Sequence, residues 1–403
     1  MITVQEAIDM TLKETSVLDI EVVSLLDASG YVLSEDVYSD IDIPPFDKSA
    51  MDGYAVKYEN TKHYPAVFGV VGFIPAGVYS DIIIESGQTA KIMTGAPLPK
   101  GADCVQMVEK TEPLGNGKVK ILESVSFGLH VSKKGEIIQA KSKVFSKGTH
   151  ITPAVISVLA AVGKEEVQIY QRPKVGILVT GDELVEVHQK PNPGQIRNSN
   201  GYTLYHQVCE TGANPELFGI APDNLEELRR KIEYGLKKDV LLISGGVSMG
   251  DLDLVEEVFE KLGIHIFYNK VSIKPGKPSV FGRKDNTLVF GLPGNPVSAS
   301  TVFEIIVKPA MRKMMGFNRV HNLKIKAMLV EGFKNRSNRE YFYPARTYYI
   351  NDQWHVLPIP SKGAADVLAL SKSNSFLVVP KEVKEMKKGE WADVMLCNDF
   401  LNT

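Results

Sequence analysis

Two hydrophobic patterns divide the chain. After residue 173, short continuous apolar runs such as "KVGILVTG" and "DVLLISGG" alternate with stretches of helical periodicity such as "NLEELRRKIEYGL". Continuous apolar runs are typical of strands that are buried on both faces. Their alternation with helices predicts an α/β fold with a doubly wound, mostly parallel sheet over residues 173–317.

Strand-rich segments flank this region on both sides. Residues 51–135 contain short β-branched runs cut by glycine and proline, as in "AVFGVVGFIPAG", which predicts a small β domain. After Gly316 the helical pattern stops, and "LKIKAMLV" and "FLVVP" predict a carboxy-terminal β domain over residues 318–403. Helical spacing of apolar residues at 3–15 and 153–162 predicts two further helices.

The composition limits the classes of function. The chain has 403 residues, 44% of them hydrophobic, enough for two or three cored domains of roughly 150 residues each. The net charge of -2 argues against a general nucleic-acid binder. The three cysteines lie far apart and lack a metal-binding or redox spacing. No signal peptide is visible and no apolar run approaches the roughly 20 residues that span a bilayer, so we expect a soluble, cytoplasmic protein that binds neither nucleic acid nor membrane.

The loops after the predicted strands are acidic or rich in glycine. They comprise residues 180–183, 221–223, 244–253 and 291–296. In a doubly wound sheet, ligands bind at the carboxyl ends of the strands. We therefore expect one edge of the sheet to gather these loops around a ligand.

The last of these loops reads "GLPGNP". Asn295 can cap the following helix, and Pro296 suits its first turn. Gly294, which follows Pro293, lets a ligand approach the backbone closely. The free amides at the helix start would then favour a phosphate or an oxyanion. The alternative is an ordinary capped helix after a tight turn.

Carboxylates gather in the other three loops, and each has an ordinary alternative. Asp223 could form a capping box with Glu226, and Asp251 and Asp253 precede a predicted helix, whose dipole favours acids. Together with Glu183, however, they would crowd like charges beside a phosphate-type site. A divalent cation such as Mg²⁺, which prefers one or two carboxylates plus phosphate oxygens and water, would relieve that repulsion.

Two lysines, Lys274 and Lys277, flank a Pro-Gly turn in "SIKPGKP". Two ammonium groups on a rigid turn could clamp an oxyanion. The alternative is a solvated hairpin tip, which Pro-Gly also favours.

The segment "GVSMG" (246–250) matches the Gly-x-Ser-x-Gly pattern of a hydrolase nucleophile elbow, with Ser248 as the nucleophile. Asp285 with His321 or His355 could complete a triad. Such an elbow would give no role to the acidic pair at 251 and 253 or to the two lysines. Neither a dinucleotide-binding Gly-x-Gly-x-x-Gly nor a P-loop is present.

Taken together, the motifs resemble the family of molybdopterin molybdenumtransferases, the MoeA proteins, and the related E-domain of gephyrin. The resemblance covers essentially the whole chain. Its motifs are "PPFDKSAMDGYAV" (44–56), "IMTGAPLPKGAD" (92–103), "GDEL" (181–184), "GQIRNSNGYTL" (194–204), "APDN" (221–224), "SGGVSMGDLD" (244–253), "IKPGKP" (273–278) and "GLPGNPVS" (291–298).

The resemblance implies a Mg²⁺-dependent insertion of molybdenum from molybdate into adenylylated molybdopterin, with release of AMP and molybdenum cofactor. It implies a homodimer and makes the molybdopterin adenylyltransferase a candidate partner. It also implies an elongated linking domain over residues 1–50 and 136–172, a lid formed by 51–135, a molybdopterin-binding domain over 173–317 and a barrel-like domain over 318–403. A dimeric scaffold of the gephyrin type, or a serine hydrolase that uses Ser248, is the alternative function.

Individual positions follow from the resemblance and the loop analysis. Asp52 and Thr94 correspond to lid-side residues tied to activity, and the segment 360–370 only loosely resembles the family's Ser-Gly-rich stretch. We expect Glu183, Asp223 and Asp253 to hold the metal and act in catalysis. We expect the substrate and the oxyanion to be bound by Gly246, Ser248, Asp251, Lys274, Lys277, Pro293, Gly294, Asn295 and Arg346.

Overall fold

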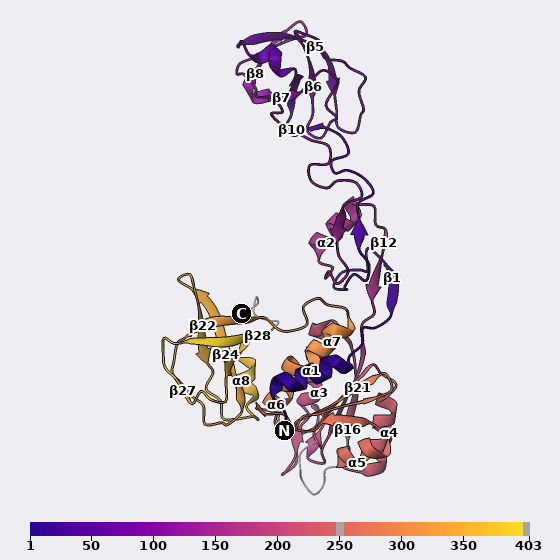
Figure 1. The fold of residues 1–403 in the computed structure, drawn as a ribbon, viewed down its shortest axis with the longest axis vertical. Helices are drawn as coiled ribbons and strands as arrows, with labels where there is room; N and C mark the ends of the chain where they lie inside the picture. The colour runs from indigo at the N-terminus through magenta and orange to yellow at the C-terminus, as the bar shows by residue number, and fades with distance from the viewer. Residues whose placement is uncertain (247–253, 398–403) are drawn as a thin grey trace. The chain divides into compact units, whose positions relative to one another are not determined.

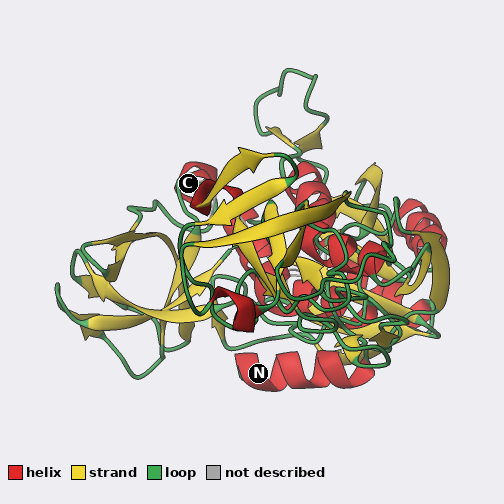
Figure 2. Ribbon diagram, turned by 90° about the horizontal axis from the view of Figure 1, so that it is seen from above, coloured by secondary structure: helices red, strands yellow, loops and turns green. Residues whose placement is uncertain are grey.

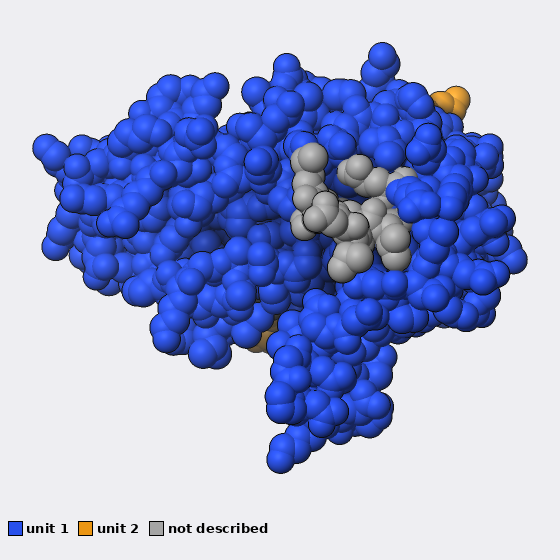
Figure 3. All heavy atoms as spheres, turned by 90° about the horizontal axis from the view of Figure 1, so that it is seen from below, with its two compact units in different colours: residues 1–34, 148–153, 166–403 blue, residues 35–147, 154–165 orange. Residues whose placement is uncertain are grey.

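The computed structural model describes residues 1–246 and 254–397, and residues 247–253 and 398–403 lie outside the described ranges. The chain forms two compact units, which Figure 3 colours separately. Unit 1 comprises residues 1–34, 148–153 and 166–403, and unit 2 comprises residues 35–147 and 154–165.

A six-stranded sheet forms the centre of unit 1 (Figure 1). The strand order is β16-β13-β17-β21-β20-β18, in which the first four strands are parallel and β20 is antiparallel to both of its neighbours. This sheet confirms the predicted doubly wound, mostly parallel fold. The strands are β13 (Lys174–Thr180), β16 (Asn214–Ala221), β17 (Val240–Ser244), β18 (His265–Tyr268), β20 (Val280–Lys284) and β21 (Thr287–Leu292).

Helices cover both faces of this sheet. One face packs against α4 (Leu225–Gly235) and α5 (Leu254–Lys261), and the other against α1 (Val4–Glu14), α3 (Asn200–Thr211) and the helical segment 296–314. In Figure 2, α1 carries the N-terminus marker. Neighbouring strand residues alternate between the two cores, which explains why the strands read as continuous apolar runs.

Local signals in the sequence set the helix boundaries. Thr3 and Glu6 form a capping box at the start of α1, in which each side chain accepts a hydrogen bond from the other residue's backbone amide. Helix α3 ends at Gly212, whose φ of 93° is a conformation that glycine adopts without strain. The predicted helices at 3–15 and 153–162 are confirmed as α1 and α2 (Pro153–Ala161).

A closed barrel forms the carboxy-terminal part of unit 1. Five strands pair in the order β24-β25-β22-β28-β26, and β26 pairs back onto β24. The closed ring confirms the predicted barrel-like domain. A short strand, β19 (Ile273–Lys274), joins β24 by parallel pairing and thus brings the Lys274 turn beside the barrel. The ring strands are β22 (Lys324–Leu329), β24 (Glu340–Ile350), β25 (Gln353–Pro358), β26 (Ser375–Val379) and β28 (Trp391–Leu396).

Unit 2 contains a second six-stranded sheet, as the glycine- and proline-punctuated β-branched runs predicted. Its strand order is β7-β4-β6-β5-β9-β8. Two small apolar cores, one with Phe68 and one with Ile74, pack against it. The strands are β4 (Gly53–Val56), β5 (Ala66–Ile74), β6 (Gln88–Ile92), β7 (Cys104–Met107), β8 (Thr111–Gly115) and β9 (Lys118–Ile121).

The remaining elements are short. Strand β1 pairs with β12, β2 with β11, β3 with β10, β14 with β15 and β23 with β27. They are β1 (Ile20–Ser24), β2 (Val37–Tyr38), β3 (Lys48–Ser49), β10 (Val131–Ser132), β11 (Lys143–Phe145), β12 (Glu166–Tyr170), β14 (Leu184–Val185), β15 (Ile196–Arg197), β23 (Phe333–Lys334), β27 (Glu385–Met386), η1 (Tyr58–Thr61), η2 (Val108–Lys110) and α8 (Val367–Ser371).

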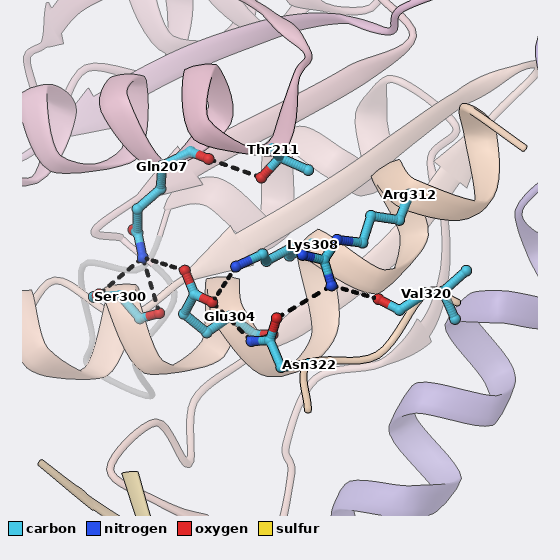
Figure 4. Close-up of polar contacts among 8 residues, drawn as sticks. All are labelled: Gln207, Thr211, Ser300, Glu304, Lys308, Arg312, Val320 and Asn322. Carbon is cyan, nitrogen blue, oxygen red and sulfur yellow. Dashed lines mark hydrogen bonds and ion pairs between the residues drawn. The ribbon is translucent and has the colours of Figure 1, made fainter. Parts of the chain in front are cut away.

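A buried polar network lies on the helical segment formed by α6 (Pro296–Val302), the π-helical turn η3 (Phe303–Val307) and α7 (Lys308–Met314) (Figure 4). At its centre, Lys308 Nζ and Asn322 Nδ2 donate to Glu304 Oε2 at 2.7 and 2.8 Å, and Gln207 Nε2 of α3 donates to Oε1 at 3.2 Å. The side chains of Lys308 and Glu304 are only 1% and 7% exposed. Because both charges are partnered, the interior tolerates them.

No helix within residues 1–246 and 254–397 combines the length and apolar character needed to cross a membrane.

Candidate functional site

A pocket of about 630 Å³ opens at the carboxyl ends of the central strands. Its lining includes Glu183 after β13, Asp223 after β16, Gly246 after β17 and Asn295 after β21. The described parts of the four predicted loops therefore do meet at one edge of the sheet. Three expected positions in the third loop, Ser248, Asp251 and Asp253, lie outside the described residues.

Glycines allow these loops to approach one another. Gly245 has a φ of 97°, and a Cβ at this position would collide with the backbone carbonyl oxygen of Thr180. Gly246 has a φ of 61°, and its Cβ would lie 2.7 Å from Val255 Cγ2. Gly294 lies against the Cα of Gly245, since its Cβ would be 3.7 Å from that atom. Glycine at these positions thus lets the loops after β13, β17 and β21 pack closely, where a side chain at Gly245 or Gly246 would collide with its neighbours.

Asp223 does not cap helix α4. Asn224 is the N-cap, and its Oδ1 accepts from the backbone amides of Glu226 and Glu227 at 3.0 and 3.2 Å. Asp223 instead accepts a hydrogen bond from Thr180 Oγ1 at 2.8 Å. The capping-box alternative is therefore wrong by one residue, and the Asp223 carboxylate is turned toward the end of β13.

The acidic groups around the pocket have unused acceptor capacity. Within the described ranges, the Glu183 carboxylate makes no hydrogen bond or ion pair, and Asp223 accepts through Oδ1 alone. Asp182 lies beside them, since its Oδ1 accepts from the Asp223 backbone amide at 2.9 Å. Across those same residues, no group of three or more His, Cys, Asp or Glu side chains is placed to hold a metal ion by itself.

Asn295 occupies the N-cap position of α6, and Pro296 follows in the first turn, as the sequence predicted. Its side chain, however, makes no capping hydrogen bond. The expected side-chain cap is therefore wrong. Pro293, Gly294 and Asn295 all line the pocket, with Asn295 and Gly294 exposed on its rim.

A second pocket, of about 320 Å³, lies between the Lys274 turn and the barrel. Lys274 and Lys277 line it together with Arg339, which the sequence analysis did not name. The Lys274 ammonium lies 4.4 Å from the centroid of the Tyr341 ring. Burial, and then the charge of Arg339, lower the pKa of Lys274 from its usual value. The pocket therefore concentrates positive charge that no carboxylate in its lining neutralises.

The two pockets adjoin. Pro278 and Asn295 line both of them. The divergent segment 360–370 lies along the same boundary, because Ser361 lines the basic pocket and Ala365 lines the acidic one. An anion held by the lysines would thus sit next to a ligand held at the strand ends.

Arg346 is exposed on strand β24 and is not among the residues that line the basic pocket. Arg339 takes that place, and its guanidinium donates to the backbone oxygen of Ile273 at 2.8 Å. Ile273 precedes Lys274 and belongs to β19, which pairs with the start of β24. Only this strand pairing reveals Arg339, since the sequence carries no local signal for it.

Asp52 and Thr94 meet in unit 2. The Thr94 backbone amide and Oγ1 both donate to Asp52 Oδ1, at 2.7 and 2.8 Å. These two bonds, the amide first, lower the pKa of Asp52 below its usual value. Two motifs that are separate in the sequence, "MDGYA" and "MTGAP", therefore form one structural pair.

A doubly wound domain with a pocket at its strand ends, joined to a closed barrel, defines a multidomain α/β protein. Three family models match the chain: the MoeA N-terminal region (domain I and II) at residues 2–163, a probable molybdopterin binding domain at 176–313 and the MoeA C-terminal region (domain IV) at 326–397. The chain belongs to the MoeA family.

Individual proteins show the same relationship over nearly the full length. The molybdopterin molybdenumtransferase of Bacillus subtilis is 33% identical, covering 94% of this chain and 90% of the relative. That of Staphylococcus aureus strain N315 is 32% identical, covering 98% and 95%. The crystal structure of the molybdopterin biosynthesis moeA protein from Pyrococcus horikoshii OT3 superposes with a TM-score of 0.84 at 30% identity, covering 98% of this chain and 100% of that one.

Proposed function

We propose that this chain is a molybdopterin molybdenumtransferase of molybdenum cofactor biosynthesis. In the proposed reaction, molybdenum from molybdate is placed on the dithiolene sulfurs of adenylylated molybdopterin, and AMP and molybdenum cofactor are released. The relatives' names support the transferase activity, and the two pockets support the finer assignment of substrates.

The adjoining acidic and basic pockets are the observation on which the proposal rests. The reaction requires two anions, a phosphate-bearing pterin and an oxyanion, to be held side by side. One pocket offers glycine-rich backbone and carboxylates that can share a cation with phosphate, and the other offers Lys274, Lys277 and Arg339. Their common boundary at Pro278 and Asn295 would place the reacting groups next to each other, and such positioning is a major source of rate enhancement.

The pocket's carboxylates fit Mg²⁺ shared with a substrate. Glu183 and Asp223 have free oxygen acceptors, and Mg²⁺ typically takes one or two carboxylates together with phosphate oxygens and water. Glu183 and Asp223 would hold the ion from the protein side, and Asp253 remains a predicted ligand outside the described residues. When bound, the ion would neutralise charge on the adenylyl phosphates.

The lysines would bind molybdate. Ammonium and guanidinium groups form charge-assisted hydrogen bonds with oxyanions, about twice as strong as neutral ones. Lys274 is partly buried against Tyr341, so its charge is less screened by solvent than that of the exposed Lys277.

We further propose that the protein acts as a homodimer, with Asp52 and Thr94 of one subunit completing the site of the other, and that the molybdopterin adenylyltransferase delivers the substrate. The Asp52–Thr94 pair is exposed and fixed in orientation, as a group that meets a ligand must be. Sedimentation equilibrium tests the assembly, and a monomer at all concentrations would refute it.

A serine hydrolase is disfavoured as the alternative. A triad through Ser248 needs a histidine beside it, and no histidine occurs among the described residues that line the strand-end pocket. Of the two histidines considered, His355 lies on β25 of the barrel. A scaffold of the gephyrin type would not require the carboxylates or the lysines.

The test is AMP release from adenylylated molybdopterin with saturating Mg²⁺ and molybdate. We expect E183Q and D223N each to lose at least about a hundredfold in rate, because the ion that would neutralise the phosphates loses a carboxylate that holds it. In the same assay K274A/K277A should require far more molybdate for half-maximal rate. The controls are E260Q on α5 and K388A in the barrel, both exposed. Wild-type rates in E183Q and D223N would overturn the proposed function.

A further inference from the structure

Two asparagine side chains in the strand-end pocket each contain an atom without a hydrogen-bond partner. Asn198 and Asn200 line the pocket and are only 1% and 7% exposed. Within the described part of the chain, Asn198 Nδ2 and Asn200 Oδ1 are buried and have no partner. Buried polar groups are nearly always paired, so each unpaired one calls for an explanation.

The orientation of the Asn200 amide is fixed by its neighbours. Its Nδ2 donates to the carbonyl oxygen of Gly294 and to Ser244 Oγ, both at 2.8 Å. The Gly294 carbonyl can only accept, and the Ser244 hydroxyl donates to the Pro293 carbonyl oxygen at 3.3 Å. A flipped amide would set oxygen against oxygen. Oδ1 is therefore an acceptor that no donor among the described residues satisfies.

The Asn198 amide is fixed in the opposite sense. Its Oδ1 accepts from the backbone amide of Gly201 at 2.9 Å. A flip would face two donors toward each other, so Nδ2 is the free atom. The two residues, two positions apart at the start of α3, both line the pocket, and their unpaired atoms are one donor and one acceptor.

We propose that Asn198 and Asn200 together bind the edge of a nitrogen heterocycle that carries a hydrogen-bond acceptor beside a donor, and so determine ring specificity. The inference rests on the proposed function, whose substrate contains two such rings. A pterin presents N3–H beside a carbonyl, and adenine presents N1 beside an amino group. Both edges match the pair, so the experiment must distinguish them.

Binding of neutral probes to the full-length protein separates the two rings. The probes are 6-hydroxymethylpterin and adenosine, together with 3-methyl-6-hydroxymethylpterin and N6,N6-dimethyladenosine, whose methyl groups remove the donor that Asn200 Oδ1 needs. We expect one parent ring to bind and its methylated form to bind at least about tenfold more weakly, since a polar site rejects a ligand that leaves its groups unpaired. The parent ring that binds shows whether the two asparagines recognise the pterin or the adenine of the substrate.

The Asn198 contact is tested by N198D. Asp keeps the size and the acceptor for Gly201 but replaces the Nδ2 donor with an acceptor, so the affinity for the parent ring should fall about tenfold. Neutral probes are used so that the added charge does not repel the ligand directly. The matched control is N335D, at a buried asparagine of the barrel whose amide groups all have partners and which lies outside the pocket. N335D should leave ring affinity unchanged.

Two results would overturn the inference. The first is that the wild-type protein binds neither ring. The second is that methylation of the ring and N198D both leave the affinity unchanged, as expected if water alone satisfies the two amides. AMP release by the wild-type protein is measured in parallel. Normal release with unselective ring binding refutes the inference and leaves the proposed function standing. Selective ring binding without AMP release refutes the proposed function instead.

Discussion

Two polar clusters in unit 1 lie on the same two helical segments, α3 and residues 296–314. At the starts of α3 and α6, Asn198, Asn200 and the Pro293–Pro296 loop line the strand-end pocket, and Asn198 and Asn200 each leave one amide atom unpaired. Further along the same segments, Gln207, Glu304 and Lys308 form the buried network of Figure 4. The first cluster lines a cavity of about 630 Å³. The second is centred on an ion pair whose side chains are only 1% and 7% exposed, although Glu304 also lines a separate pocket of about 460 Å³.

The difference lies in how the polar groups are satisfied. In the network, both oxygens of Glu304 and the ammonium of Lys308 have partners inside the chain, and Gln207 Oε1 is left without one in the described structure. In the pocket, the donor of Asn198 and the acceptor of Asn200 have none in the described structure. A buried charged pair that is satisfied inside the chain fixes the packing of helices, whereas an unpaired amide atom costs free energy until a ligand or water pairs it. The comparison therefore predicts that changes in the network reduce stability and that changes in the pocket reduce binding.

The largest effect is expected from K308M. Removing the ammonium leaves the Glu304 carboxylate buried beside an apolar side chain, and breaking one half of a buried pair typically costs about 3–5 kcal/mol. Urea unfolding of unit 1, followed by fluorescence of Trp354 and Trp391, measures this loss. Ring affinity of the folded variant should match the wild type.

Two further variants sharpen this prediction. E304L/K308M removes both charges, and because apolar replacement of a whole buried pair is often neutral or stabilising, it should recover most of the lost stability. K326M breaks the exposed pair of Lys326 with Asp393 and should cost no more than about 1 kcal/mol. Equal losses in K308M and K326M would contradict the role assigned to burial.

The second prediction concerns the pocket itself. G245A places a Cβ against the Thr180 carbonyl in a backbone conformation that costs a non-glycine residue about 1–2 kcal/mol even without a clash. The loops must separate, so AMP release should fall at least about tenfold while the protein stays folded. G389A is the matched control, since Gly389 also has a positive φ, 86°, but a Cβ there meets nothing within 4 Å. Normal AMP release by G245A would show that the close approach of these loops is dispensable.

The fold was accessible from the sequence because its signals are long and local. Apolar runs such as β17 span five buried residues, and Thr3, Gly212 and Pro296 mark helix ends. The meeting of the strand-end loops followed from topology alone, since carboxyl ends of parallel strands share an edge.

The details of the site depend on contacts that the sequence does not display. The N-cap of α4 is Asn224, not the predicted Asp223. Because Asp and Asn are about equally favoured at N-cap positions, residue preferences cannot decide between two neighbouring candidates. Arg339 reaches the basic pocket only because β19 pairs with β24. The asparagine pair stands out only once its burial and its unpaired atoms are known, because asparagine is ordinarily a turn or capping residue.

The smallest effect on stability is expected at the exposed Asp52–Thr94 pair in unit 2. This pair is hydrogen-bonded but not buried, so it tests whether hydrogen bonding alone produces a large effect. T94V removes the Oγ1 bond to Asp52 and keeps the amide bond, so the pKa of Asp52 should rise part of the way toward 3.8. Because folding lowers this pKa, the stabilisation that the Thr94 hydroxyl provides is present above about pH 4 and disappears as the pH falls through the folded pKa. The stability difference between wild type and T94V should therefore be small at pH 7 and vanish once the pH lies below the folded pKa of Asp52. NMR titration of the Asp52 carboxyl measures the pKa, and thermal unfolding measures the stability. A loss as large as that of K308M would mean that hydrogen bonding, rather than burial, sets the contrast between the two clusters of unit 1.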